Sequence, residues 1–210
     1  MTTKQQIQSF IDYVCRDEVP PNAIWGMNDD GDQRTFNVTV MHEAQFTCQS
    51  MGMYAMVALD WVADLAAYLR GHRVLEVMAG RGWLAKALMH HGVVVTATDD
   101  LSWGEGRKWK PPLVPVLRLE AEEAVRRFGA EHDVLLVSWP PYDDDGALRA
   151  ARAWGDERPI VYVGEDKGGC MADDAFFDAC ADWPDAPHIF LPQWWAMHDT
   201  VWVCRYGSPR

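Results

Sequence analysis

Gly80 and Gly82 lie in a segment whose pattern suits ligand binding through the backbone. They follow an apolar run at residues 73–78 and precede a stretch with helical spacing at residues 82–91. Glycines permit a sharp turn and leave no Cβ between the backbone and a ligand. The first turn of the following helix has free N–H groups. A strand, a glycine turn and a helix in this order are typical of dinucleotide sites. The candidate binding residues here are Glu76, Ala79, Gly80 and Gly82.

Two adjacent carboxylates, Asp99 and Asp100, end the next apolar run, at residues 93–98. A carboxylate at the end of this strand is placed to accept both ribose hydroxyl hydrogens of an adenosine. We expect Asp99 to do so, while Asp100 either joins it or caps the next turn. Leu101 would then pack on the face of the adenine. Because NAD-dependent enzymes use the same arrangement, this segment predicts an adenosine without distinguishing between cofactors.

A stiff aromatic loop follows the run at residues 134–139 and reads Ser138-Trp139-Pro140-Pro141-Tyr142. Its two prolines fix an extended backbone. Open α/β sheets bind ligands at the carboxyl ends of their strands, where this loop, the glycine turn and Asp99 would meet. A dinucleotide-binding oxidoreductase has no need of such a loop at this place.

These segments resemble the class I S-adenosylmethionine-dependent methyltransferases. The glycine turn, with Glu76 four residues before Gly80, is similar to motif I of that family, and the Pro-Pro-Tyr loop is similar to motif IV of amino-group methyltransferases. The chain departs from these motifs at Met78, where a small residue is commoner, and at Trp139, where motif IV has Asn, Asp or Ser. Over residues 71–205 it resembles an uncharacterised group with a Trp-Pro-Pro-Tyr loop, also through segments 163–165, 168–170 and 173–177.

The resemblance implies S-adenosylmethionine as the cofactor and direct methyl transfer as the reaction, and it implies no substrate. Trp139, Pro140 and Tyr142 would hold the methyl acceptor, because in the family the aromatic ring stacks on a planar substrate and a loop carbonyl accepts from an amine. Trp139 is not polar and Ser138 stands one residue too early, so methylation of an amine is in doubt. Ser138 is counted with the cofactor-binding residues.

Glu120 and Ala121 follow the run at residues 114–119. In the methyltransferase family an acidic residue at this place often accepts from the adenine amino group, which makes both residues candidates for cofactor binding. An alternative of equal weight is that Glu120 only begins a helix, where a carboxylate suits the positive helix end.

Glu165, Cys170 and two tryptophans are further candidates. Glu165 would end the fifth strand, where it could accept a substrate proton or bind a cation, or else hydrogen-bond the Gly-Gly turn after it. We favour the first role. Cys170 has no evident His partner, so a structural role is favoured. Trp194 and Trp195 either border the cleft or pack against the N-terminal helices.

The alternation of apolar runs with helical patterns after Gly71 predicts the fold. Strands are expected at residues 73–78, 93–98, 114–119, 134–139, 160–163, 188–191 and 201–204. Helices are expected at 82–91, 120–129, 145–154 and 173–182, with an irregular connector near 102–110. This order predicts a doubly wound, mostly parallel seven-stranded α/β sheet of the Rossmann-like type. The last two runs, joined without a helix, predict an antiparallel hairpin.

The first 70 residues predict an N-terminal, mainly helical extension that packs on or caps the cleft, leaving residues 71–210 as the methyltransferase domain. A helix is expected at residues 4–17 and a longer one at 51–69, where apolar side chains recur at helical spacing. The polar stretch between them contains one short expected strand, at residues 35–40.

Composition narrows the function classes. The net charge of −12 argues against sequence-independent nucleic-acid binding, which needs clustered Lys and Arg. No apolar stretch long enough for a membrane span and no signal-peptide pattern occur, so we expect a cytoplasmic protein. The five scattered cysteines predict neither a disulfide framework nor a zinc site, and no metal ligands are expected.

The sequence therefore predicts an S-adenosylmethionine-dependent methyltransferase whose acceptor is unidentified, with a small molecule or protein group favoured over nucleic acid. Three alternatives stay open at this point. They are an amino-group methyltransferase of DNA or RNA, an NAD-dependent oxidoreductase, and a catalytically silent cofactor-binding module.

Overall fold

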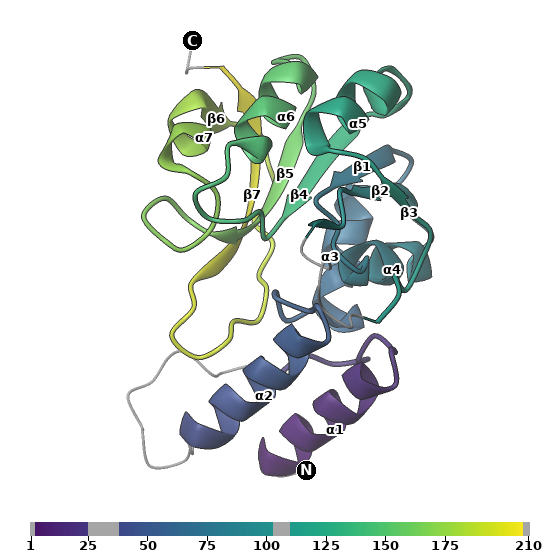
Figure 1. Ribbon diagram of the computed structural model, residues 1–210, viewed down its shortest axis with the longest axis vertical. Coiled ribbons are helices and arrows are strands. Elements are labelled where there is room, and N and C mark those ends of the chain that lie inside the picture. Colours follow the sequence, from purple (N-terminus) through teal and green to yellow (C-terminus); the bar gives the residue numbers. More distant parts are fainter. Residues whose placement is uncertain (1–2, 25–37, 103–109, 208–210) are drawn as a thin grey trace.

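The computed structural model describes residues 3–24, 38–102 and 110–207. Its centre is a seven-stranded sheet of order β3-β2-β1-β4-β5-β7-β6 (Figure 1). The strands are β1 (Arg73–Val77), β2 (Val94–Asp99), β3 (Val116–Arg118), β4 (Val134–Ser138), β5 (Ile160–Glu165), β6 (Cys180–Asp182) and β7 (Asp199–Tyr206). Strands β1 to β5 pair in parallel, and β7 runs antiparallel to β5 and β6. The predicted fold class is confirmed.

Helices cover both faces of the sheet because successive side chains of its central strands point to opposite faces. Val74 belongs to the core under α3 (Leu59–Tyr68) and α4 (Trp83–His90). Leu75 belongs to the core under three other helices, α5 (Ala121–Phe128), α6 (Gly146–Trp154) and α7 (Asp174–Ala179). Strands β1, β4 and β5 are buried almost throughout, which explains their unbroken apolar runs.

The N-terminal helices α1 (Thr3–Cys15) and α2 (Val38–Ser50) lie together at one end of the molecule (Figure 1). Their buried side chains, among them Phe10 and Met41, join the same core as Val74 of the sheet. Phe10 meets Trp194 edge-on, with ring centroids 6.0 Å apart. A domain boundary at residue 70 stays a prediction, and the hydrophobic core is continuous across it.

The long helix predicted for residues 51–69 is confirmed over Leu59–Tyr68, as α3, and is wrong from residue 51 to residue 58, where the chain is not helical. Gly52 takes a positive φ of 73° there. The Met51 carbonyl accepts from Arg81 Nη1 at 2.7 Å and from Trp83 Nε1 at 2.9 Å. The side chains of Arg81 and Trp83 thus occupy a carbonyl that a continuous helix would use for its own backbone hydrogen bond. Helix α2 also replaces the strand predicted at 35–40, of which 35–37 lie outside the described residues.

The predicted position of the sixth strand is also wrong. Residues 188–191 form no strand, and β6 lies earlier, at the end of the helix predicted for residues 173–182. Ile189 and Leu191 are buried in the core without strand pairing, so their apolar pattern reflected burial alone. The antiparallel hairpin predicted for residues 188–191 and 201–204 is therefore wrong, and β7 pairs antiparallel with β6 instead. The connector expected near 102–110 lies mostly outside the described residues.

A buried guanidinium joins three segments of the chain. The side chain of Arg81 is 1% exposed. Besides Met51, it donates to the Pro111 carbonyl at 3.0 Å and to Asp17 Oδ1 at 2.9 Å. The glycine turn is therefore tied to the end of α1, to the non-helical segment after α2, and to the chain that leads into β3.

Replacing Arg81 by Met should lower the free energy of unfolding by about 3 kcal/mol, because it leaves buried carbonyls without donors. The matched control is Arg73→Met, since Arg73 makes an exposed ion pair with Glu131 at 3.4 Å. That change should cost roughly 0.5 kcal/mol or less. Urea unfolding of both variants measures the difference, and equal losses would contradict the role assigned to Arg81.

Candidate ligand-binding site

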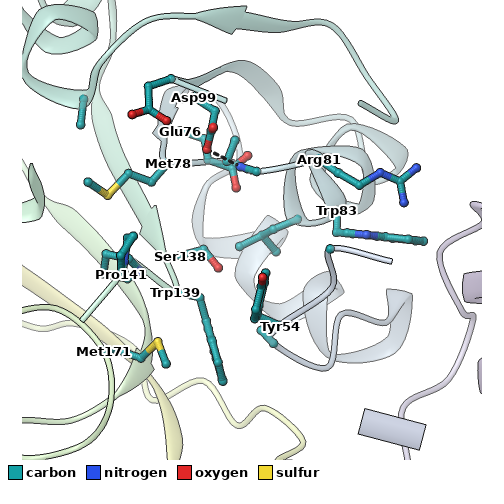
Figure 2. A pocket seen from close by; sticks show the side chains of 18 of the residues that line it. Tyr54, Glu76, Met78, Arg81, Trp83, Asp99, Ser138, Trp139, Pro141 and Met171 are labelled. Carbon is teal, nitrogen blue, oxygen red and sulfur yellow. Dashed lines mark hydrogen bonds between the residues drawn. The ribbon is translucent and has the colours of Figure 1, made fainter. Parts of the chain in front are cut away.

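A cavity of about 450 Å³ lies at the carboxyl ends of β1, β2 and β4 (Figure 2). It brings together most of the predicted site residues: Glu76, Ala79, Gly80, Asp99, Asp100, Glu120, Ala121, Ser138, Trp139, Pro140 and Tyr142. Gly82, Leu101 and Glu165 are not part of its wall. Residues 49–57 also line the cavity, as expected of an N-terminal extension that packs on or caps the cleft. The rest of the wall consists of Met78, Arg81, Trp83, Leu84, Ser102, Leu119, Pro141, Asp144, Arg149 and Met171.

The two glycines of the turn serve different purposes. Gly80, with φ of 56°, lines the cavity, and a Cβ on it would meet nothing within 4 Å. Gly82, with φ of 80°, precedes α4, and a Cβ there would lie 2.7 Å from Val114 Cγ2. Gly80 therefore keeps space open for a ligand, whereas Gly82 allows the turn to pack against the chain before β3.

Glu76 is a buried acid at the cavity, 1% exposed, and its Oε2 has no hydrogen-bond partner among the described residues. Burial and the nearby charge of Asp99 raise the pKa of Glu76 to about 8, against the lowering effect of the Ala85 N–H. A carboxyl held this way favours a cationic ligand, which would stabilise its ionised form.

Asp99 fixes the shape of the turn. Its Oδ2 accepts from the Gly80 N–H and its Oδ1 from the Leu101 N–H, each at 2.7 Å. Leu101, with φ of 59°, does not reach the cavity, so the expectation that it packs on an adenine is wrong for this structure. Leu119, from the next strand end, lines the cavity instead. Asp100 lines it too, and its Oδ1 accepts from the Ser102 N–H at 2.9 Å, as a cap would.

Glu120 begins a helix, which was one of the two roles predicted from the sequence. It is the N-cap of α5, and its Oε2 accepts from the N–H groups of Glu122 and Glu123 at 3.0 and 3.2 Å. Its Oε1 pairs with Arg149 Nη1 at 2.9 Å. The carboxylate also lines the cavity beside Ala121. Both roles are therefore compatible with its position.

Trp139 is held in an unusual backbone conformation. Its φ of 51° lies in the left-handed region, and its N–H donates to the Val163 carbonyl at 2.8 Å. The indole stacks on Tyr54, with centroids 5.7 Å apart and planes at 29° (Figure 2). Pro140 is buried beside it, while the ring of Tyr142 is 59% exposed at the cavity.

Behind Trp139 lies Asp199, a buried carboxylate that no motif indicated. It is 2% exposed, and neither of its oxygens has a hydrogen-bond partner among the described residues. The Trp139 indole N–H is near enough to lower its pKa but lacks hydrogen-bonding geometry. Burial outweighs that effect and, with the charge of Glu165, raises the pKa of Asp199 to about 7.

Glu165 lies outside the cavity, contrary to the expected site role. Its Oε2 accepts from the N–H and the thiol of Cys170, both at 3.0 Å, and its Oε1 from the His198 N–H at 3.1 Å. Burial alone would raise its pKa, but these hydrogen bonds hold the pKa below its ordinary value. Burial and Glu165 raise the pKa of Cys170 to about 11, which keeps the thiol protonated. Glu165 therefore stabilises the Gly-Gly turn that follows it, which was the alternative role predicted from the sequence.

The two adjacent tryptophans also pack in the structure. Trp194 is fully buried against Phe10, and its Nε1 donates to the Tyr54 carbonyl at 2.8 Å. Trp195 meets His42 of α2, with centroids 5.1 Å apart. Packing against the N-terminal helices is thus the observed role, and through Tyr54 it supports the cavity wall.

Within the described parts of the chain, no group of three His, Cys, Asp or Glu side chains is arranged to hold a metal ion. Across the same residues, no helix is long and apolar enough to cross a bilayer.

No protein-family model and no curated protein matches the chain. Similar solved structures include 1,6-didemethyltoxoflavin-N1-methyltransferase of Burkholderia thailandensis with bound S-adenosylhomocysteine (19% identity, 81% of this chain, 85% of that chain, TM-score 0.45). Magnesium protoporphyrin IX methyltransferase of Synechocystis PCC 6803 with bound SAM is 11% identical, with 98% of both chains covered and a TM-score of 0.44. MtNAS in complex with MTA and tNA is 16% identical (99% of this chain, 70% of that chain, TM-score 0.46). These distant likenesses assign neither ligand nor substrate to this chain.

Replacing Glu76 by Gln should change how stability depends on pH. The carboxyl titrates near 4.5 in the unfolded chain and near 8 in the folded one. Between those values the folded state binds the extra proton, so the free energy of unfolding falls as pH rises. Gln removes this contribution, so the advantage of the variant over the wild type should grow from pH 5 to pH 8 in urea unfolding. A difference independent of pH would refute the assignment.

Proposed function

We propose that the chain is an S-adenosylmethionine-dependent methyltransferase that transfers a methyl group directly to a small molecule or protein group. The observation that supports it most is a single cavity joining the glycine turn, the carboxylates after β2 and the Trp-Pro-Pro-Tyr loop. The resemblance of these segments to motifs I and IV supports the methyltransferase class. The antiparallel β7 between β5 and β6 departs from the all-parallel dinucleotide-binding sheet.

The residues present fit the proposed cofactor. S-adenosylmethionine carries an ammonium and a sulfonium group, and Glu76 offers a buried oxygen without a partner at the cavity. The open backbone at Gly80 would receive the methionine part. The carboxylates of Asp99 and Asp100 would accept from the ribose hydroxyls, and Leu119 would pack on the adenine. When bound, the cofactor supplies an electrophilic methyl group.

The other end of the cavity would position the acceptor. Trp139 and Tyr54 form a stacked aromatic wall, and Pro140 and Tyr142 continue it. Exclusion of water and alignment of the nucleophile with the methyl carbon are the main contributions that these residues can make. Ser138, at the end of β4, lies between the two ends of the cavity in Figure 2.

Thermal unfolding with separate excesses of S-adenosylmethionine, S-adenosylhomocysteine and NAD tests the class. A ligand at a hundred times its Kd adds about 2.7 kcal/mol to stability, which should raise Tm by roughly 5–10 °C for a chain of this size. We expect the shift with the two sulfur compounds and none with NAD. A shift with NAD alone would replace the proposal with an oxidoreductase. Binding of the sulfur compounds without methylation of any cell extract would indicate a silent binding module.

A Cβ at position 80 should obstruct the cofactor. Gly80→Ala is expected to weaken S-adenosylhomocysteine binding at least tenfold, as measured by isothermal titration calorimetry, because the added methyl group points into open space at the cavity. Gly92→Ala is the matched control: Gly92 also has a positive φ, 82°, and open space around its Cβ, but lies outside the cavity wall. Both changes strain the backbone by about 1–2 kcal/mol. Equal affinities in the two variants would count against the proposed cofactor position.

A further inference from the structure

The acceptor end of the cavity is flat and aromatic. Figure 2 shows Trp139 and Tyr54 facing each other at the end away from Asp99, with Met171 beside Trp139. Trp139 is partly buried and packs against both hydrophobic cores, and its backbone N–H donates to the Val163 carbonyl. The carbonyl of Tyr54 is held by Trp194. The two rings, with centroids 5.7 Å apart, leave no room for a ligand between them, so a planar ligand would stack on the outer face of this pair in offset geometry.

The charges of the cavity disfavour an anionic acceptor. Only two cationic side chains are among its described lining residues, and both are engaged. Arg81 pairs with Asp17, and Arg149 pairs with Glu120 at 2.9 Å and with Asp145 at 2.8 Å. The acidic lining residues are Glu76, Asp99, Asp100, Glu120 and Asp144. A phosphate or carboxylate on the acceptor would find no unengaged cation among the described lining residues, whereas a neutral or cationic ring meets no repulsion from these acids.

The acceptor end also has no strong base. Among the described residues that line the cavity there is no His, Lys or Cys. Asp144 is exposed, and its Oδ1 accepts from the Gly146 N–H at 2.7 Å. A carboxylate is too weak a base to ionise an alcohol or a phenol at neutral pH. Asp199 lies behind Trp139 and does not line the cavity. A nucleophile that carries a free lone pair and no proton to be removed needs no such base.

From these three observations, and resting on the proposed function, we infer that the acceptor is a planar nitrogen heteroaromatic without acidic groups, methylated on a pyridine-type ring nitrogen. The lone pair of that nitrogen forms the new N–C bond while the C–S bond breaks. The electrons of the C–S bond stay on sulfur, and the positive charge passes from sulfur to the ring. No proton moves, so no general base is required.

The product of this transfer is a cationic ring, and the cavity suits it. An indole is the aromatic side chain that interacts best with a cation over its face, and Trp139 supplies one where the resembled motif has a polar residue. The acidic residues that line the cavity also attract a cationic ring. Where the polar residue of motif IV would hydrogen-bond an amine, Trp139 thus offers a surface on which a charged ring can stack.

Two ring compounds of opposite charge test the inference. In the presence of saturating S-adenosylhomocysteine, isothermal titration calorimetry would compare 1-methylquinolinium with quinoline-4-carboxylate. We expect the cation to bind at least tenfold more tightly. Incubation with quinoline and S-adenosylmethionine should also yield 1-methylquinolinium, detected by mass spectrometry. Equal or tighter binding of the carboxylate, or no binding of either ring, would overturn the inference.

Substitutions locate the binding. Trp139→Leu should weaken 1-methylquinolinium binding at least tenfold. If that variant does not fold, Tyr54→Leu replaces it, because Tyr54 is 42% exposed and its side chain contributes less to the core. Trp195→Leu is the control, since Trp195 is an exposed aromatic residue outside the cavity wall. Binding of S-adenosylhomocysteine by the wild type separates the two proposals. If it binds and the ring does not, only the acceptor class fails; if it does not bind, the proposed function itself fails.

Discussion

The site depends on one buried charge. A guanidinium removed from water is stable only where its N–H groups find acceptors, and Arg81 finds them in three segments distant in sequence. The need to satisfy this group draws the segment after α2 against the glycine turn. That segment carries Tyr54, so the aromatic wall is positioned by the same interaction that anchors the glycine turn. Lys86 reinforces the arrangement by donating to the Asp17 carbonyl.

Buried carboxylates give the cavity its electrostatic character. Glu76 and Asp199 flank the two ends of the site, one at the cavity and one behind its aromatic wall, and burial raises the pKa of each into the neutral range. Glu165 is less deeply buried, with 8% of its surface exposed, and stays ionised because backbone N–H groups stabilise it. The charges of the three acids thus follow both their depth of burial and their hydrogen-bond donors.

Much of this architecture was predictable from sequence, because the central strands are buried on both faces and their residues form continuous apolar runs. Strands β1, β2, β4 and β5 and the three helices between residues 83 and 154 lie within a few residues of their expected bounds. The motifs at the strand ends also come together, since parallel strands carry their carboxyl ends to one edge. These predictions follow from local pattern and topology.

Two of the failures share a physical cause. Residues 51–58 have helical spacing, but Arg81 and Trp83 compete for the Met51 carbonyl, and such a tertiary contact leaves no local signal. Glu165 resembled a site residue because it ends a strand, and its acceptors are used by Cys170 and His198, which sequence spacing does not reveal. Asp199 was overlooked because it opens a strand rather than ending one. For Met51 and Glu165, hydrogen-bond donors that folding brings near decided the outcome.

The position of β7 has a consequence for how the protein forms during synthesis. β7 lies between β5 and β6, so β6 has no partner in the sheet until residues 199–206 have left the ribosome. Trp194, which holds the Tyr54 carbonyl, belongs to the same late stretch. The glycine turn and the strands beside it can assemble early, whereas the aromatic wall closes only afterwards. A nascent chain would therefore form the glycine-turn end of the cavity first and its aromatic end last.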